Sequence, residues 1–98
     1  MADAEGVARA RGVTEYANKK NGATQPGYKG GSPYANDGRG NSTILPRQTQ
    51  SGTSIKYYEY DIFPYQKGVN RGGFRVVIGD NGSAYYTNNH YKSFVQIK

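Results

Sequence analysis

The second half of the chain alternates apolar and polar residues with the two-residue period of β-strands. A strand is predicted from Ser54 to just before Pro64, with Tyr57, Glu59 and Asp61 on one face. Residues 74–78 predict another strand, whose Arg75 lies on the face opposite its larger apolar residues. Two more strands are predicted over residues 83–87 and 92–97, so the pattern indicates an antiparallel meander.

Turn residues separate these strands. Asp80-Asn81-Gly82 predicts a tight hairpin, because Asn-Gly favours the positive φ angles of a type I′ turn. Asn88-Asn89-His90 predicts a second turn before the last strand.

The N-terminal region has helical periodicity over residues 2 to about 21, and Gly22 fits a C-terminal cap. Gly6 and Gly12 weaken this pattern. Two alternatives follow: a helix over the whole region, or an ordered helix over residues 13–21 only. In the second alternative, residues 1–11 form a poorly ordered leader or an added extension.

Residues 22–52 are rich in Gly, Pro, Asn, Ser and Thr without a sustained period, so this region is predicted to be loops that wrap a scaffold. The predicted fold class is therefore α+β, with one N-terminal helix packed on a twisted antiparallel sheet of about four to five strands. Residues 1–98 are expected to form a single domain. The sheet face opposite the helix would be free to carry a site.

Composition narrows the chemistry. The 98 residues contain no cysteine and one histidine, which excludes disulfides, thiol nucleophiles and cysteine-ligated zinc. No apolar run is long enough to cross a bilayer, and the N-terminus lacks a signal-peptide pattern. We therefore expect no membrane partner and no metal site.

The charge balance favours a polyanionic partner. Thirteen Lys and Arg residues against seven Asp and Glu residues give a net charge of +6. Ten tyrosines could supply stacking surfaces for bases, although tyrosine is also a common strand residue. RNA, DNA, acidic lipid and acidic protein all fit the charge alone.

Four residues suit RNA cleavage: Glu59, Arg71, Arg75 and His90. RNA carries its own nucleophile, the 2′-hydroxyl, so a protein needs a base, an acid and cations around the phosphate. With one histidine, a carboxylate must take one of the two proton-transfer roles. The alternatives are a surface histidine in a turn, arginines paired with Asp61 or Asp80, and an exposed edge-strand glutamate.

The segments around these residues resemble the barnase family of microbial ribonucleases. The similarity is carried by Tyr58-Glu59-Tyr60-Asp61, by residues 70–77 and by residues 85–94, with upstream contributions from residues 30–36 and Leu45-Pro46. The resemblance implies transesterification of single-stranded RNA to a 2′,3′-cyclic phosphate without metal or cofactor. Glu59 would be the general base, His90 the general acid, and Arg71 and Arg75 would hold the phosphate. Tyr91 would line the base or phosphate pocket.

The same resemblance implies a substrate loop that begins at Tyr34. Where the family presents an arginine and a guanine-reading glutamate after Asn36, this chain has Asp37-Gly38-Arg39. Either Asp37 reaches the base, or backbone amides contact it and guanine preference is lost or relaxed. Lys56 and Lys29 complete the expected substrate-binding residues, with Lys29 in place of a family lysine that has no direct equivalent. Asn89 replaces a common aspartate beside the histidine.

The resemblance also extends to biological context. Some members of this family are toxin domains that bacteria deliver into target cells, and the producer protects itself with an acidic inhibitor. We expect a secreted or delivered effector domain, monomeric, that acts in the target-cell cytoplasm. The alternative is a non-catalytic module that binds RNA or another polyanion. A metal-dependent DNase is disfavoured, because the sequence has no carboxylate cluster to hold a metal.

Overall fold

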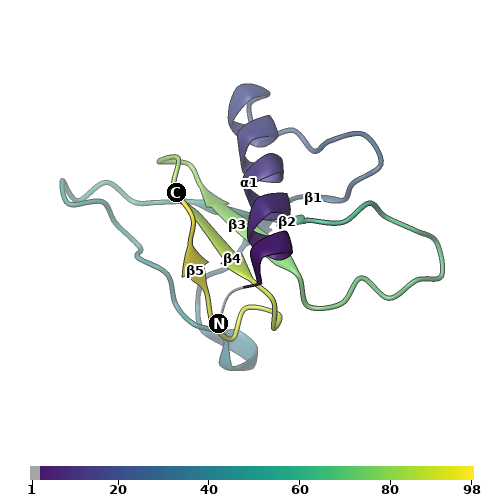
Figure 1. The fold of residues 1–98 in the computed structure, drawn as a ribbon. Coiled ribbons are helices and arrows are strands. Elements are labelled where there is room, and N and C mark those ends of the chain that lie inside the picture. Colours follow the sequence, from purple (N-terminus) through teal and green to yellow (C-terminus); the bar gives the residue numbers. More distant parts are fainter. Residues whose placement is uncertain (1–2) are drawn as a thin grey trace.

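A computed structural model describes residues 3–98, and it contains one α-helix packed on one five-stranded antiparallel sheet (Figure 1). The strands pair in chain order, which confirms the predicted meander and the α+β class. Long loops extend from opposite sides of the sheet, residues 35–56 on one side and residues 62–74 on the other. The elements are α1 (Ala4–Lys19), β1 (Gly30–Tyr34), the short 3-10 helix η1 (Arg39–Asn41), β2 (Tyr57–Asp61), β3 (Arg75–Gly79), β4 (Ala84–Thr87) and β5 (Val95–Gln96).

The pleat of the sheet sorts its side chains onto two faces. Tyr60, Val76 and Tyr86 point toward α1 and pack with its buried residues Ala10, Val13 and Ala17. The opposite face carries a smaller apolar cluster, in which Leu45 from the long loop covers Tyr57, Val77 and Tyr91. The charged strand residues lie on the part of the same face that Leu45 does not cover.

Helix α1 begins at Ala4, so the alternative of an ordered helix over residues 13–21 only is wrong. Asp3 caps its N-terminus by accepting a hydrogen bond from the N–H of Gly6, and Ala10 is fully buried. Gly22 closes the C-terminus as predicted, because its N–H donates to the carbonyl of Ala17 at 2.7 Å. Within residues 3–98, no helix has the length and apolar character needed to cross a membrane.

The sequence pattern failed to predict strand β1. Residues 22–52 were expected to be loops, yet Gly30–Tyr34 pairs with β2. This strand lies at the edge of the sheet and buries little, so its Gly-Gly-Ser-Pro-Tyr sequence shows no alternation. An edge position also tolerates Pro33, which cannot donate to a second neighbour.

The other strands differ from prediction mainly in length and turn geometry. The last strand is reduced to Val95–Gln96, and β2 covers only the centre of its predicted range. The hairpin between β3 and β4 is present, but Asn81 does not have the positive φ of a type I′ turn. Only Gly82 does, with φ of 89°, and the Asn81 side chain instead accepts hydrogen bonds from Ser83.

Gly6 is explained by a tertiary contact rather than by helix propensity. The hydroxyl of Tyr86 passes beside it to donate a hydrogen bond to the Asp3 carboxylate at 2.6 Å. A Cβ atom on residue 6 would overlap that hydroxyl. The glycine that weakened the helix prediction is therefore what allows β4 to reach the helix cap.

We expect Gly6→Ala to lower the free energy of unfolding by about 1–3 kcal/mol, the usual cost of overpacking. Gly12→Ala is the matched control, because a Cβ there meets nothing within 4 Å. It should raise stability by about 0.5–1 kcal/mol through helix propensity. Urea denaturation followed by circular dichroism measures both, and changes of the same sign would contradict this account.

The Asp3 cap also predicts a pH dependence. The Tyr86 hydroxyl and then the Gly6 N–H hold the pKa of the Asp3 carboxyl below its ordinary value of 3.8. A carboxyl whose pKa is lowered by folding stabilises the folded state above the unfolded pKa, and this contribution is lost as pH falls through the folded pKa. Asp3→Asn should therefore lower Tm at pH 7, and the difference from the wild type should shrink below pH 4. A Tm difference independent of pH would contradict this.

Candidate active site

The sheet face opposite α1 carries a row of polar side chains at the end away from the Leu45 cluster. Glu59 and Asp61 alternate on β2, and the register places Asp61 opposite Arg75 of β3 and Arg75 opposite Thr87 of β4. Neighbouring residues on one face lie close enough to interact directly. The face that the sequence analysis left free for a site is therefore the charged face.

Asp61 holds both of the arginines that the sequence analysis selected. Its two carboxylate oxygens accept hydrogen bonds from Nε and Nη2 of Arg71, each at 2.7 Å. Nε of Arg75 lies 3.1 Å from the same carboxylate, and Nη1 of Arg75 donates to the carbonyls of Gly72 and Phe74. The Arg75 and Asp61 side chains are only 7% and 6% exposed, whereas Arg71 is 41% exposed. Both arginines therefore pair with Asp61, as one alternative in the sequence analysis had it, but Arg75 is buried.

The contact with Asp61 has an electrostatic consequence for Arg71. The hydrogen bonds that Arg71 donates to Asp61 raise the pKa of the Arg71 guanidinium, and the negative charges of Asp61 and Glu59 add to the effect. One carboxylate thus offsets two guanidinium groups, so the cluster keeps a net positive charge beside Glu59.

Tyr91 is buried beside His90, and the charge of Glu59 acts on its hydroxyl. Burial raises the pKa of the Tyr91 hydroxyl most, and the negative charge of Glu59 raises it further, while Arg75 opposes the shift. The Tyr91 ring centroid lies 4.7 Å from that of His90 and 4.9 Å from that of Tyr34. The phenol therefore lies near the candidate base Glu59, the candidate acid His90 and the guanidinium of Arg75.

The turn that carries His90 has an unusual backbone. His90 and Tyr91 have φ angles of 57° and 74°, which non-glycine residues adopt at a cost of about 1–3 kcal/mol each. Hydrogen bonds hold both residues in place. The N–H of His90 donates to the carbonyl of Gly73 at 2.9 Å, and the N–H of Tyr91 donates to Oγ1 of the buried Thr87 at 3.1 Å.

Asn89 closes the same turn with its side chain. Its Oδ1 accepts from the Thr87 hydroxyl at 2.9 Å and from the N–H of Ser93 at 3.0 Å, and its Nδ2 donates to the Ser93 hydroxyl. The asparagine that replaces an aspartate therefore keeps a structural role beside His90, although it brings no negative charge.

The segment that precedes β3 touches the His90 turn. A Cβ atom on Gly73 would lie 2.9 Å from the backbone nitrogen of His90. Glycine at this position lets the two backbones approach, so the segment with Arg71 and the turn with His90 form one wall. The structure brings Glu59, Arg71, Arg75 and His90 onto this one side of the sheet.

The predicted substrate loop is held together by its own contacts. Asn36 is buried with φ of 53°, and its amide exchanges hydrogen bonds with the backbone of Leu45. Asp37 accepts hydrogen bonds from the guanidinium and then from the backbone N–H of Arg39, which lower the pKa of the carboxyl to about 2. Gly38, with φ of 79°, permits this turn. The Asp37 carboxylate is thus engaged within the loop rather than free.

The remaining substrate-binding candidates are Lys56 and Lys29. Lys56 lines a groove of about 670 Å³ together with Tyr34, Asn36 and Asp37, next to the substrate loop. The ammonium of Lys29 lies 4.3 Å from the centre of the exposed Tyr65 ring, a cation–π contact. Its carbonyl accepts from the N–H of Asp61. Lys29 therefore contributes backbone to the site, and its charge is engaged at Tyr65.

The sequence analysis missed Asp61 and Thr87 as site residues. Asp61 was considered only as a neutralising partner, although it shares the strand face of Glu59 and is itself an unfavourable strand residue. That signal could have identified it. Thr87 gave none, because a threonine in a strand is unremarkable in sequence. Within residues 3–98, no three His, Cys, Asp or Glu side chains are grouped closely enough to hold a metal ion.

The geometry defines a small α+β domain with a carboxylate, an imidazole and two guanidinium groups on the open face of its sheet. The ribonuclease family model matches residues 4–98, so the chain belongs to the ribonuclease family. Guanyl-specific ribonuclease St of Saccharopolyspora erythraea is 39% identical over 70 residues, an alignment that covers 67% of this chain. It covers 64% of that relative. The resemblance to barnase-type microbial ribonucleases is thereby confirmed.

The buried ion pair predicts a large stability effect. Asp61→Asn should lower the free energy of unfolding by about 3–5 kcal/mol, because it leaves the Arg75 charge buried without its partner. Glu5→Gln, which removes an exposed pair with Arg9, should change it by no more than about 0.5 kcal/mol. Urea denaturation compares the two variants. A loss of similar size in both would mean that the Asp61 pair contributes no more than a surface contact.

Proposed function

We propose that this protein is a metal-independent endoribonuclease that cleaves single-stranded RNA by transesterification. The observation that carries the proposal is the Asp61 cluster, in which two guanidinium groups are held on the sheet face that carries Glu59. Membership of the ribonuclease family supports it.

In the proposed reaction, the Glu59 carboxylate takes the proton from the 2′-hydroxyl of the nucleotide on the 5′ side of the cut. The 2′-oxygen then forms a bond to phosphorus, and the bond from phosphorus to the 5′-oxygen of the next nucleotide breaks. Protonated His90 gives its proton to that leaving oxygen. The products are a 2′,3′-cyclic phosphate and a free 5′-hydroxyl, and slow hydrolysis of the cyclic phosphate follows with the two proton-transfer roles exchanged.

Arg71 and Arg75 stabilise the phosphorane in this proposal. Donors fixed before the reaction need no reorganisation when charge develops on the phosphate oxygens. The bidentate bond of Arg71 to Asp61 and the burial of Arg75 supply this fixation. Tyr91 is buried, and the opposite charges of Glu59 and Arg75 both act on its hydroxyl. We propose that it lines the phosphate or base pocket.

The name of the relative, guanyl-specific ribonuclease St, indicates a preference for guanine in that protein. We propose that base preference is weaker in this chain. The Asp37 carboxylate is bound by Arg39, so it must leave that ion pair before it can accept from a base edge. Backbone amides of residues 36–39 and the Tyr34 ring remain as base contacts. Cleavage after several bases, with guanine at most favoured, is the expected pattern.

We also propose the biological setting on the basis of resemblance and charge. A net charge of +6 suits a monomeric toxin domain that acts on RNA in the cytoplasm of a target cell after secretion or delivery. The same charge suits an acidic inhibitor protein that protects the producing cell.

Single-residue variants test the proposed roles. Glu59→Gln and His90→Ala should each lower kcat/KM by about 10²–10⁴-fold, the usual range for one proton-transfer group. Glu15→Gln, on the exposed surface of α1, is the matched control and should leave the rate unchanged. Purified protein is incubated with defined oligoribonucleotides in chelator, and mapped termini report the rate, the cyclic phosphate and the base preference.

Three outcomes of that experiment would reject the proposal. Cleavage of a strand with a 2′-deoxy sugar at the cut site would exclude the 2′-hydroxyl as nucleophile. Loss of activity in chelator would show a metal requirement. Tight RNA binding without any product would instead support a non-catalytic binding module.

A further inference from the structure

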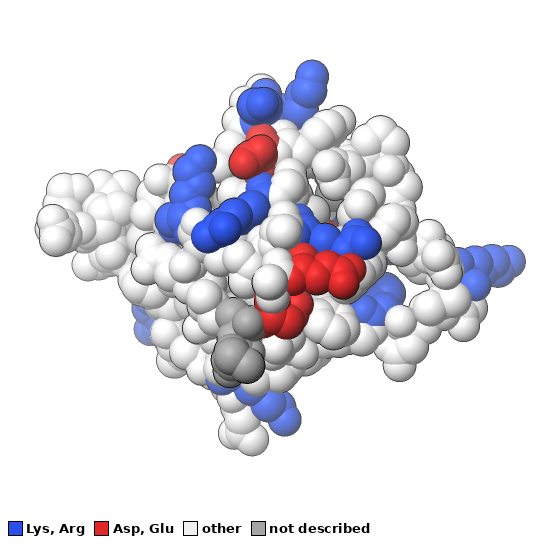
Figure 2. All heavy atoms as spheres, in the orientation of Figure 1, with Lys and Arg blue, Asp and Glu red and all other residues white. Residues whose placement is uncertain are grey.

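The two sides of the molecule carry different kinds of contact. On the face over α1, acidic and basic side chains lie side by side, as Figure 2 shows, and Glu5 pairs with Arg9 at 3.0 Å. Opposite charges this close offset each other, so this face offers little net charge to a polyanion. The other side carries a contact that none of the proposed chemical steps uses. It joins the substrate loop, which follows Tyr34, to the turn that holds His90.

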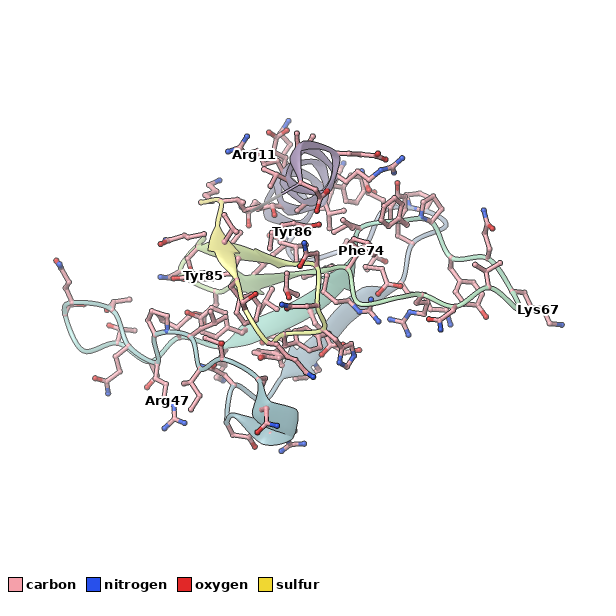
Figure 3. The ribbon with its side chains drawn as sticks, turned by 60° about the horizontal axis from the view of Figure 1, so that its bottom comes forward. Arg11, Arg47, Lys67, Phe74, Tyr85 and Tyr86 are labelled. Carbon is pink, nitrogen blue, oxygen red and sulfur yellow. The ribbon has the colours of Figure 1, made fainter. Side chains whose placement is uncertain are left out.

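Thr43 makes this contact from the substrate loop. Its N–H donates to the carbonyl of Tyr91 at 2.8 Å, and its hydroxyl donates to the carbonyl of Lys92 at 2.6 Å. Figure 1 and Figure 3 both show the turn after β4 next to the loop that carries η1. One residue therefore holds two consecutive carbonyls of a turn that lies far along the chain.

The two bonds complete the support of a strained backbone. His90 and Tyr91 both have positive φ, and their N–H groups donate to Gly73 and Thr87. Thr43 holds the carbonyls that follow, so the strained pair is fixed on both of its sides. A backbone of this kind persists only where the surrounding structure over-determines it. Loss of the Thr43 hydroxyl would therefore leave the end of the turn freer to relax.

The backbone of this turn decides where the imidazole lies. His90 is exposed, and its ring contacts the adjoining ring of Tyr91, with centroids 4.7 Å apart. A change of φ or ψ at these two residues moves both rings directly. Misplacement of a reacting group by about 1 Å can lower a rate by about 10²-fold. A hydrogen bond that fixes the turn therefore bears on proton transfer by His90.

The substrate loop is itself anchored, so Thr43 has a firm base. Asn36 exchanges hydrogen bonds with the backbone of Leu45, and Leu45 packs in one cluster with Tyr91. Residues 37–44 thus form a closed loop whose ends meet at Asn36 and Leu45. This loop is proposed to contact the base, and Thr43 joins it to the proposed acid.

We propose that Thr43 is a positioning residue for His90, and that its hydrogen bonds link the substrate loop to the proposed general acid. The inference rests on the proposed ribonuclease function. It concerns the transfer of a proton to the leaving 5′-oxygen and not the binding of RNA.

A substrate whose leaving group needs no proton tests this role. Thr43→Val removes the hydroxyl donor and keeps the N–H and the branched shape of the side chain. It should lower kcat for a dinucleotide roughly 10–100-fold and leave KM nearly unchanged. With the same nucleoside as its 3′-(4-nitrophenyl phosphate), kcat should be unchanged, because 4-nitrophenolate leaves without protonation. His90→Ala should show the same selective loss.

Two further variants control for the fold. Water can satisfy the Lys92 carbonyl in Thr43→Val, so that variant should fold. Thr43→Ser keeps the hydroxyl and should retain the wild-type kcat. Thr49→Val makes the same replacement in the same long loop, where the hydroxyl contacts only Ser51 and Thr53 among residues 3–98, and it should leave both rates unchanged. Equal loss with both substrates in Thr43→Val, or no loss with either, would overturn the inference.

The imidazole reports its position without turnover. His90 is the only histidine of the 98 residues, so the NMR signal of its Hε1 proton is identified at once. At constant pH the signal should shift or broaden in Thr43→Val, but not in Thr43→Ser or Thr49→Val. An unchanged signal in Thr43→Val would overturn the positioning role even if the protein cleaves RNA. A changed signal in a protein that cleaves no strand would reject the proposed reaction and support the positioning role.

Discussion

The arrangement of the open face depends on one buried carboxylate. Asp61 joins Arg75 of the neighbouring strand to Arg71, which lies in the long segment between β2 and β3. Guanidinium groups that lie beside one another repel, and burial of Arg75 would be costly without a partner. The negative charge of Asp61 reduces the repulsion between the two guanidinium groups and gives buried Arg75 a partner.

A second constraint acts on the histidine. Two consecutive residues with positive φ are unfavourable in isolation, and the turn persists because Thr87, Asn89 and the carbonyl of Gly73 determine it from several sides. Strain of this kind often accompanies function, since it aims a side chain that relaxed geometry would direct elsewhere. The absence of a Cβ on Gly73 links this turn to the segment that carries Arg71, so the proposed acid and the proposed phosphate site are positioned by the same contact.

The ion pairs at the two ends of the proposed RNA site differ. In the substrate loop, Asp37 forms an ion pair with Arg39, so the charge of its carboxylate is already engaged and contributes little to binding a base edge. At the other end, Arg71 remains partly exposed although it is bound to Asp61. Binding energy in this chain is therefore expected to come more from phosphate and stacking contacts than from base reading.

The sequence alone determined the meander, the helix on one face and the assignment of Glu59 and Arg75 to the other face. These follow from local periodicity, because a strand with one buried face must alternate and a helix must keep its apolar residues on one side. The order of motifs also identified the four proposed catalytic groups and the family. Gly22 and the Asn81-Gly82 hairpin were recognised from local backbone preferences, although the turn type was not.

Only the tertiary structure decided the rest. Strand β1 exists because β2 offers it an edge, and nothing in Gly30–Tyr34 alternates. Gly6 belongs in the helix because Tyr86, eighty positions along the chain, needs the space beside Asp3. Asp61 and Thr87 acquire their roles from residues brought together by folding. Periodicity in the sequence predicts which side of an element is buried, whereas contacts between residues distant in the sequence produce no regular pattern.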